Sequence, residues 1–318
     1  MSDLNKIPLV VIVGPTASGK TSLSIEVAKA LDGEIVSADS MQIYKGMDIA
    51  TAKPTSQEQQ GVKHHLIDFL DVSESFSVAQ YCELAHECIK DIYDRGKLPI
   101  LVGGTGLYID SLINNVTFSK ADSDEMLREE LMIEYEQKGV DYLLDILREF
   151  DEQSAIRLSV EKNPKRIIRA IEIFKTTGIT MTEHNLKSHD VESPYKTVII
   201  GLNAEKREVI YDRINKRVDI MVENGLLNEA EKHLEVKHSN TAAMAIGHKE
   251  LLPFFGGERE LDYCIENLKM QTRRYAKRQL TWFNRNEDIH WFYLDNTCKE
   301  DLITKAIKLI KKELFNEE

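Results

Sequence analysis

The sequence predicts an α/β fold in which a parallel sheet is flanked by helices and carries an all-helical insertion. Three observations support this class. Apolar runs and helical patterns alternate over the first hundred residues, the pattern becomes wholly helical after about residue 118, and a β-rich run returns at residues 197–202. Strand–helix–strand order favours a doubly wound parallel sheet, whose ligands bind where the strands end.

Uninterrupted apolar runs predict strands that are buried on both faces. They lie at residues 9–13, 34–37 and 98–102. Helical periodicity predicts helices over 20–31 and 77–94, between these runs. A last short strand is expected at 289–294, after a largely helical stretch.

The predicted insertion spans residues 119–193, within a core made of 1–118 and 194–318. Residues 122–152 hold twelve acidic and three basic residues with helical periodicity. A helix of opposite character is expected over 163–175, followed by an exposed loop or hairpin at 177–195. The insertion is therefore a separate helical domain, acidic where it begins.

The charge balance is acidic, with a formal net charge of −12. Taken alone, this argues against a general nucleic-acid binder, because phosphate contacts need basic surface. Two local runs depart from it: residues 269–285 carry six basic and no acidic side chains, and residues 163–178 carry four basic and one acidic. Both could follow a nucleic-acid backbone or simply be solvated helix faces.

Cysteine usage and hydropathy bear on the compartment. None of the four cysteines forms a CxxC pair, which favours reduced thiols in a cytoplasmic protein. No signal peptide is evident, and no apolar stretch approaches the roughly 20 residues that span a bilayer. We expect no membrane partner and a monomer as the oligomeric state.

A phosphate-binding motif follows the first predicted strand and opens the next helix. The eight residues that match G-x-x-x-x-G-K-[ST] are Gly14, Pro15, Thr16, Ala17, Ser18, Gly19, Lys20 and Thr21. Such a loop turns backbone N–H groups and a helix N-terminus toward a phosphate, while Lys20 neutralises it and the Thr21 hydroxyl can hold Mg²⁺. The motif predicts a P-loop NTPase-like sheet that binds a phosphate-bearing ligand, with ATP the first candidate.

The usual companion of a P-loop is missing. Nucleotide hydrolases carry a strand that ends in aspartate, but residues 98–102 lead into Gly-Gly-Thr-Gly at 103–106. The second strand instead ends near Asp39, which could hold a metal, accept a proton, or serve as a turn or cap residue. In the segment that follows, Gln42 could pair with a base edge and Met41 or Tyr44 could pack on a base face, unless it is a surface loop.

Together these segments resemble the tRNA dimethylallyltransferase family, also called tRNA isopentenyltransferases. The resemblance rests on GPTASGKT (14–21), DSMQIYKGMDIATAK (39–53), GGTGLY (103–108) and RYAKRQLTWF (274–283), in order along most of the chain. It implies transfer of a dimethylallyl group from dimethylallyl diphosphate to the exocyclic amine of the adenine 3′ of the anticodon. The substrates would be tRNAs that read codons beginning with U, with diphosphate released and Mg²⁺ assisting.

The resemblance also implies residue roles. Lys20, Thr21 and the loop amides would stabilise the departing diphosphate, and Asp39 would accept the proton of the amine. Thr105 would lie near the bridging oxygen or the target base. Arg217 would be a further diphosphate ligand, its alternative being a solvated surface pair with Arg213.

The tRNA side of the site follows from the same resemblance. The target adenine must leave its stack to reach the P-loop, so base flipping is expected, and the insertion would close on the anticodon stem-loop. The implied tRNA-binding residues are Asp39, Ser40, Met41, Gln42, Thr105, Arg128, Asn163, Pro164, Lys165, Arg166, Ile167, Arg274 and Arg278.

Three positions depart from the family pattern, and two other functions stay open. Ala50 stands where glycine is usual, while Met244 and His248 stand where glutamine and tyrosine are usual.

A P-loop small-molecule kinase would share the strand–loop–helix, although an acidic insertion fits a phosphate lid poorly. A non-catalytic, nucleotide-gated RNA-binding protein would bind tRNA and form no product.

Overall fold

The computed structural model describes residues 6–118, 124–188 and 191–317, which divide into two units. One unit comprises Met1–Ile113 with Pro194–Glu318, and the other comprises Asn114–Ser193. The predicted insertion at 119–193 falls within the second unit. Its expected first residues, 119–123, lie outside the described part of the chain.

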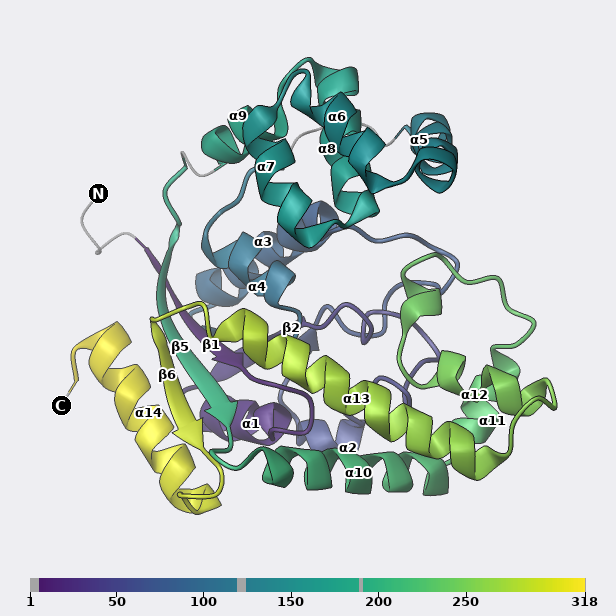
Figure 1. Ribbon diagram of the computed structural model, residues 1–318. Coiled ribbons are helices and arrows are strands. Elements are labelled where there is room, and N and C mark those ends of the chain that lie inside the picture. The colour runs from purple at the N-terminus through teal and green to yellow at the C-terminus, as the bar shows by residue number, and fades with distance from the viewer. Residues whose placement is uncertain (1–5, 119–123, 189–190, 318) are drawn as a thin grey trace. The chain divides into compact units, whose positions relative to one another are not determined.

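Six parallel strands form the sheet of the first unit, in the order β3-β2-β4-β1-β5-β6 (Figure 1). Their bounds are β1 Ile7–Val13, β2 Gly33–Ala38, β3 His64–His65, β4 Leu98–Gly103, β5 Tyr195–Asn203 and β6 Ile289–Tyr293. The connection that follows β1 leads to β2, toward one edge of the sheet. The connection that follows β4 leads to β5, toward the opposite edge. The carboxyl ends of β1 and β4 therefore flank the switch point of the sheet, where ligands of such folds bind.

Both faces of the sheet are buried, as the uninterrupted apolar runs predict. Alternate strand residues such as Val10 and Ile12 join one core with helices α1 (Lys20–Ala30) and α14 (Lys299–Phe315). On the other face lie α3 (Val78–Asp94) and α4 (Gly106–Ile113). The α/β class and the strands predicted from the sequence are confirmed.

Tyr81 ties α3 to the sheet and to α4. Its ring stacks on that of Tyr108 with 4.1 Å between centroids, and its hydroxyl donates to the carbonyl of Ser37 at 3.1 Å. The side chain is fully buried. These contacts fix the end of β2, and with it the loop that carries Asp39.

The remaining helices of the first unit surround the carboxyl edge of the sheet. They are α2 (Ser56–Gln59), α10 (Arg207–Glu223), α11 (Leu226–Lys232), α12 (His248–Phe255) and α13 (Leu261–Phe283), with a 3₁₀ turn at Ala242–Met244. In Figure 1 the long α13 runs beside α10, and the two helices pack on each other. No helix in the described part of the chain combines the length and the apolar character that crossing a bilayer requires.

The second unit is built from five helices around one core. They are α5 (Glu125–Lys138), α6 (Val140–Arg148), α7 (Glu152–Glu161), α8 (Pro164–Thr177) and α9 (Met181–Ser188). The predicted exposed loop or hairpin at 177–195 was wrong for its middle, which is α9. Thr180 and Glu183 cap this helix reciprocally, each side chain accepting the other's backbone N–H at 3.1 Å.

Candidate active site

The P-loop leaves β1 through two glycines in backbone conformations that other residues rarely adopt. Gly14 has φ +144°, and a Cβ there would lie 2.4 Å from the carbonyl oxygen of Leu202. Gly19 has φ +93° and caps α1. Between them Ser18 is fully buried, and its Oγ has no hydrogen-bond partner among the described residues. The loop thus keeps a polar atom and the first N–H groups of α1 ready for an anion.

Lys20 folds back over this loop. Its Nζ donates to the carbonyl oxygens of Gly14 at 3.0 Å and Pro15 at 2.8 Å. Burial lowers the pKa of Lys20 to about 7. The positive charge of Arg217 lowers it further, whereas the negative charge of Asp39 raises it. A bound anion would favour the charged ammonium of Lys20.

Arg217 reaches the P-loop from α10. Its Nη1 donates to Thr16 Oγ1 at 3.2 Å and its Nη2 to the carbonyl of Ala52 at 3.5 Å. Burial lowers the pKa of Arg217, with Asp39 acting in the opposite direction. Arg213 bonds separately, through Nε to the carbonyl of Ala17 at 2.8 Å. The alternative of a solvated surface pair of Arg213 and Arg217 is therefore wrong. Arg217 lines the same cavity as Lys20.

A cavity of about 290 Å³ joins the P-loop to the ends of β2 and β4. Its lining includes nine of the residues predicted for the site. These are Thr16, Lys20, Thr21, Asp39, Ser40, Met41, Gln42, Arg217 and Arg278, together with Gly103 and Gly104. Residues from five distant segments of the sequence thus face one space, which has cationic groups at the P-loop and a carboxylate at β2.

Asp39 serves as a turn residue and also lines the cavity. Its Oδ1 accepts the backbone N–H groups of Met41 at 2.9 Å and Gln42 at 3.3 Å, which makes it a turn residue. The same side chain lines the cavity. Gln42 is used for the loop as well, since its Nε2 donates to the carbonyls of Thr51 and Ala52, each at 3.2 Å.

Thr105 lies against the turn that Asp39 forms. Its Oγ1 accepts the backbone N–H of Ser40 at 3.1 Å, and its own N–H donates to the carbonyl of Ala38 at 3.2 Å. These two hydrogen bonds therefore hold the Gly-Gly-Thr loop after β4 against the turn after β2. Tyr44, considered for stacking on a base, is fully buried with its hydroxyl 3.4 Å from Ser239 Oγ, so that interpretation was wrong.

Several cavity residues on α13 and α12 were not identified from the sequence as site residues. Gln279 is buried and connects the P-loop to Gly104, and Tyr275 faces the cavity with a pKa raised by burial and by Asp39. Ile246 and Lys249 also line the cavity. The run 274–283 was noted for its charge, but only the fold shows that its uncharged members enter the site.

Of the basic residues on α13, Arg274 and Arg278 are exposed, and Arg278 also borders the cavity. The Arg278 guanidinium lies 5.7 Å from the centre of the Tyr275 ring, within the range of a cation–π contact. Positive charge thus continues from the cavity along an exposed helix face.

The predicted tRNA contacts of the second unit have structural partners there. Arg128 Nε lies 2.9 Å from Glu172 Oε1, and Glu172 is fully buried. Asn163 caps α8 by accepting the N–H of Lys165 at 3.1 Å, and Pro164 begins that helix.

Two further predictions in this unit have different outcomes. Arg166 forms an ion pair with Glu161 and stays exposed. The side chain of Ile167 is completely buried in the core of the unit, so the predicted RNA contact through it was wrong. An apolar side chain on the inner face of an amphipathic helix stabilises the core instead.

The cavity also offers ligands suited to Mg²⁺. Thr21 and Asp39 both line it and present a hydroxyl and a carboxylate, the hard oxygen donors that this ion prefers. Diphosphate oxygens would complete such a site. The residues present therefore fit the ion expected from the sequence.

Comparison with known proteins decides the family. A family model described as IPP transferase matches residues 42–286, well over half of the chain. The chain belongs to the IPP transferase family. The resemblance seen in the sequence is thereby confirmed.

Curated relatives of this IPP transferase match it over nearly its whole length. The tRNA dimethylallyltransferase of Acetivibrio thermocellus is 48% identical over 302 residues, covering 94% of this chain and 96% of the relative. That of Bacillus subtilis is 47% identical over 311 residues, covering 98% and 96%.

Solved structures of the same family share its fold. The full-length tRNA isopentenylpyrophosphate transferase of Bacillus halodurans has a TM-score of 0.74 at 44% identity, covering 98% of both chains. A eukaryotic dimethylallyltransferase acting on tRNA has a TM-score of 0.84 at 29% identity, covering 98% of this chain and 80% of the other.

The three departures from the family pattern have defined places in this IPP transferase. Ala50 lies against Gly247, where a Cβ would be 2.7 Å from the Cβ of Ala50. Met244 lines the cavity although it is largely exposed. His248 begins α12 and binds Glu229, away from the P-loop. None of the three replaces Lys20, Asp39 or Arg217.

Proposed function

We propose that this chain transfers the dimethylallyl group of dimethylallyl diphosphate to the exocyclic amine of the adenine 3′ of the anticodon in tRNAs that read codons beginning with U. The observation that carries the proposal is the single cavity in which the cationic P-loop faces Asp39. The names of the relatives support it, since they are tRNA dimethylallyltransferases. The protein would act as a monomer in the cytoplasm.

The P-loop side would stabilise the leaving group. As the carbon–oxygen bond of the diphosphate ester breaks, negative charge grows on the diphosphate, next to Lys20, Arg217 and the N–H groups of α1. Charge that is stabilised more strongly as it develops lowers the barrier to transfer. Mg²⁺, held by the Thr21 hydroxyl and the diphosphate, would supply further neutralisation.

The Asp39 side would hold the nucleophile. The amine nitrogen forms the new carbon–nitrogen bond and must lose a proton, which the Asp39 carboxylate would accept. The other carboxylate oxygen, Oδ2, would take the proton, because Oδ1 already accepts the N–H groups of the turn. The flipped adenine would be surrounded by the loop after β2, which includes Ser40, Met41 and Gln42. Thr105 would hold this loop through its bond to Ser40.

Exposed basic groups would position the RNA. Arg274 and Arg278 on α13 would contact phosphates near the cavity, without reading sequence. Within the second unit, Arg128, Asn163, Pro164, Lys165 and Arg166 are the corresponding candidates for the anticodon stem-loop. The acidic total charge of the chain makes such local patches the natural place for RNA contact.

One assay tests the proposal. The purified protein is mixed with Mg²⁺, dimethylallyl diphosphate labelled in its prenyl group, and a tRNA carrying adenine 3′ of the anticodon. Label should enter the tRNA, and a tRNA with guanine at that position should stay unlabelled. ATP-dependent phosphorylation of a small metabolite without prenyl transfer would indicate a kinase. Binding of tRNA with no covalent product would indicate an RNA-binding protein.

A further inference from the structure

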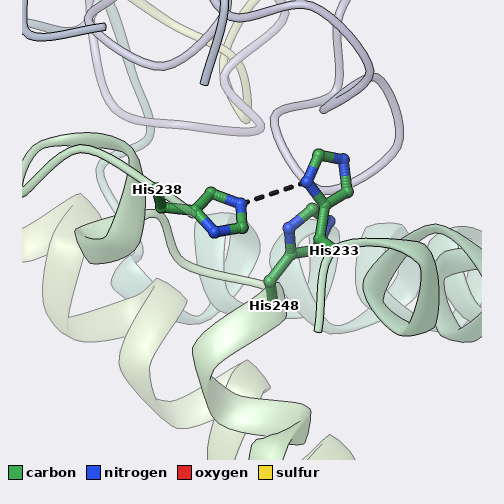
Figure 2. A group of neighbouring side chains, drawn as sticks. All are labelled: His233, His238 and His248. Atoms are coloured by element: carbon green, nitrogen blue, oxygen red, sulfur yellow. Dashed lines mark hydrogen bonds between the residues drawn. The ribbon is translucent and has the colours of Figure 1, made fainter. Parts of the chain in front are cut away.

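A cluster of three histidines lies outside the catalytic machinery. His233 follows α11, His238 lies in the segment after it, and His248 begins α12. Figure 2 shows the three rings gathered together, with a hydrogen bond between His233 and His238. One ring nitrogen from each lies within 4.8 Å of those of the other two. Imidazole nitrogens at such separations are the donors that zinc and related ions use.

The outer hydrogen bonds of two rings fix which nitrogens face the cluster. His248 Nε2 donates to Glu229 Oε1 at 2.9 Å, and His233 Nε2 donates to the carbonyl of Gly46 at 3.0 Å. As neutral imidazoles, these two rings would each carry the proton on Nε2 and present the lone pair of Nδ1 to the cluster. A carboxylate or carbonyl behind the ring is the usual support of a metal-bound histidine.

A second observation that points to a ligand comes from His248. This residue is only 9% exposed, and its Nδ1 is buried with no hydrogen-bond partner in the part of the chain that the structure describes. A buried polar atom that is left unpaired costs free energy comparable to a lost hydrogen bond. The stacked His233 ring lies 4.8 Å away, centre to centre. The unpaired atom thus belongs to the same cluster.

We propose that His233, His238 and His248 bind a divalent transition-metal ion, with Zn²⁺ as the representative ion and a water molecule as the fourth ligand. Ligand atoms about 2.0–2.1 Å from zinc in tetrahedral geometry lie about 3.3 Å apart. His233 Nδ1 and His238 Nε2 are already 3.1 Å apart, and the widest pair must close by no more than about 1.5 Å.

Binding must move one proton. His233 presents a lone pair at Nδ1, so the hydrogen bond between the two rings is donated by His238 Nε2. Zn²⁺ would replace that proton, which either leaves to solvent or moves to the other nitrogen of the His238 ring. Metal binding to neutral imidazoles is commonly accompanied by proton release of this kind.

The bound ion would connect three segments beside the cavity. Glu229, which supports His248, also accepts the backbone N–H groups of Asp48, Ile49 and Ala50 at 2.7–3.0 Å. His233 holds Gly46 of the same loop. The metal would therefore cross-link α11, α12 and the loop 46–50, which leads from Gln42 to Thr51 at the cavity wall.

The test is a direct measurement of metal binding. Full-length protein is stripped with chelator and titrated with Zn²⁺ in competition with a chromophoric zinc indicator, and separately with Co²⁺, whose visible absorption reports low-coordinate nitrogen ligation. We expect one high-affinity Zn²⁺ per chain and a rise in Tm on binding. His248→Tyr and His238→Gln should each lower the zinc affinity more than 100-fold, and Glu229→Gln by about 10–100-fold.

Matched controls separate this site from adventitious binding. His290→Gln, at an exposed histidine on β6, should keep the affinity of the unaltered protein. His238→Gln leaves the His248–Glu229 contact in place, so it tests the site even where His248→Tyr fails to fold. Zinc binding that is equal in the unaltered protein and both variants, or that occurs only at millimolar concentration, would overturn the proposal.

Discussion

The side chain of Gln279 accepts the backbone N–H of Thr16 at 2.8 Å, across 263 positions of sequence. Its Nε2 simultaneously donates to the carbonyl of Gly104 at 3.0 Å. One buried amide therefore holds the P-loop and the loop after β4 in register with each other. Because donor and acceptor ends are both used, no other side chain of similar size can make the same pair of bonds.

Replacing Gln279 by leucine should disturb the site without removing any charged group. The loss leaves a buried N–H and a buried carbonyl unpaired, at a cost of about 1–3 kcal/mol. We expect lower stability in urea unfolding and weaker diphosphate binding. Gly104→Ala should have a similar effect, because its Cβ would lie 2.1 Å from Gln279 Nε2.

The control for this prediction lies on the same helix. Gln271 donates a long hydrogen bond, 3.4 Å, to its helix neighbour Asn267, so Gln271→Leu should change neither property measurably. Equal effects of Gln271→Leu and Gln279→Leu would show that α13 is sensitive to any such change and that the bridge has no special role.

Diphosphate binding should be coupled to protonation of Lys20. The free protein has a Lys20 pKa of about 7, so most of this side chain is neutral at pH 8. A bound anion raises that pKa, hence binding takes up a proton and the affinity falls as the pH rises above about 7. Calorimetric titration at pH 8, in buffers of different ionisation enthalpy, measures this uptake.

Lys20→Met provides the comparison. It should lose the proton uptake and bind diphosphate about 10–100-fold more weakly, as expected for the loss of a charge-assisted hydrogen bond of about 1.5–3 kcal/mol. Proton uptake that persists in Lys20→Met would assign the coupling to another group.

Asp39→Asn should separate catalysis from folding. An asparagine side chain keeps an oxygen that can accept the N–H groups of Met41 and Gln42, so the turn survives, whereas it cannot take a proton from the amine. We expect a loss of transfer rate of about 10²–10⁴-fold with diphosphate affinity nearly unchanged. Single-turnover kinetics with labelled dimethylallyl diphosphate measures both quantities.

A second aspartate with the same local geometry is the matched control. Asp71 Oδ1 accepts the N–H of Ser73 at 2.9 Å in an exposed turn. Asp71→Asn should leave the transfer rate unchanged. A full rate in Asp39→Asn would restrict Asp39 to its structural role in the turn.

Arg274→Gln should change the salt dependence of tRNA binding. If this exposed side chain neutralises a phosphate, its loss makes the slope of log affinity against log salt concentration shallower by about 1. The affinity for all tRNAs should fall by a similar factor. Filter binding from low to moderate salt measures the slope. Lys308→Gln on α14, also exposed, should leave it unaltered; equal slopes for both variants would place the RNA elsewhere.

Local signals predicted most of the fold correctly. Buried parallel strands need apolar side chains on both faces, and the glycine-rich loop needs backbone that only glycine adopts easily, so both leave contiguous patterns in the sequence. The missed helix α9 also had such a signal, in the cap formed by Thr180 and Glu183. The many polar residues of that stretch suggested a loop instead.

The site was only partly predictable because its second half depends on distant contacts. Lys20 and Asp39 stand next to strand ends and could be recognised from spacing. Gln279 and Tyr275 lie on a helix whose charged residues attract attention, and nothing local shows that this face packs on the P-loop. Ile167 shows the converse error, because it was included with its basic neighbours although its own side chain is apolar and buried.

Ala50 and Gly247 have a consequence for how this sequence can change over generations. The family pattern usually has glycine at position 50, and here the extra methyl group occupies space that Gly247 leaves open, since a Cβ at 247 would be 2.7 Å from it. The two positions share room for one methyl group. Alanine at position 50 therefore makes glycine at 247 harder to replace, a form of epistasis that alignments should reveal as correlated substitution at two sites almost two hundred residues apart.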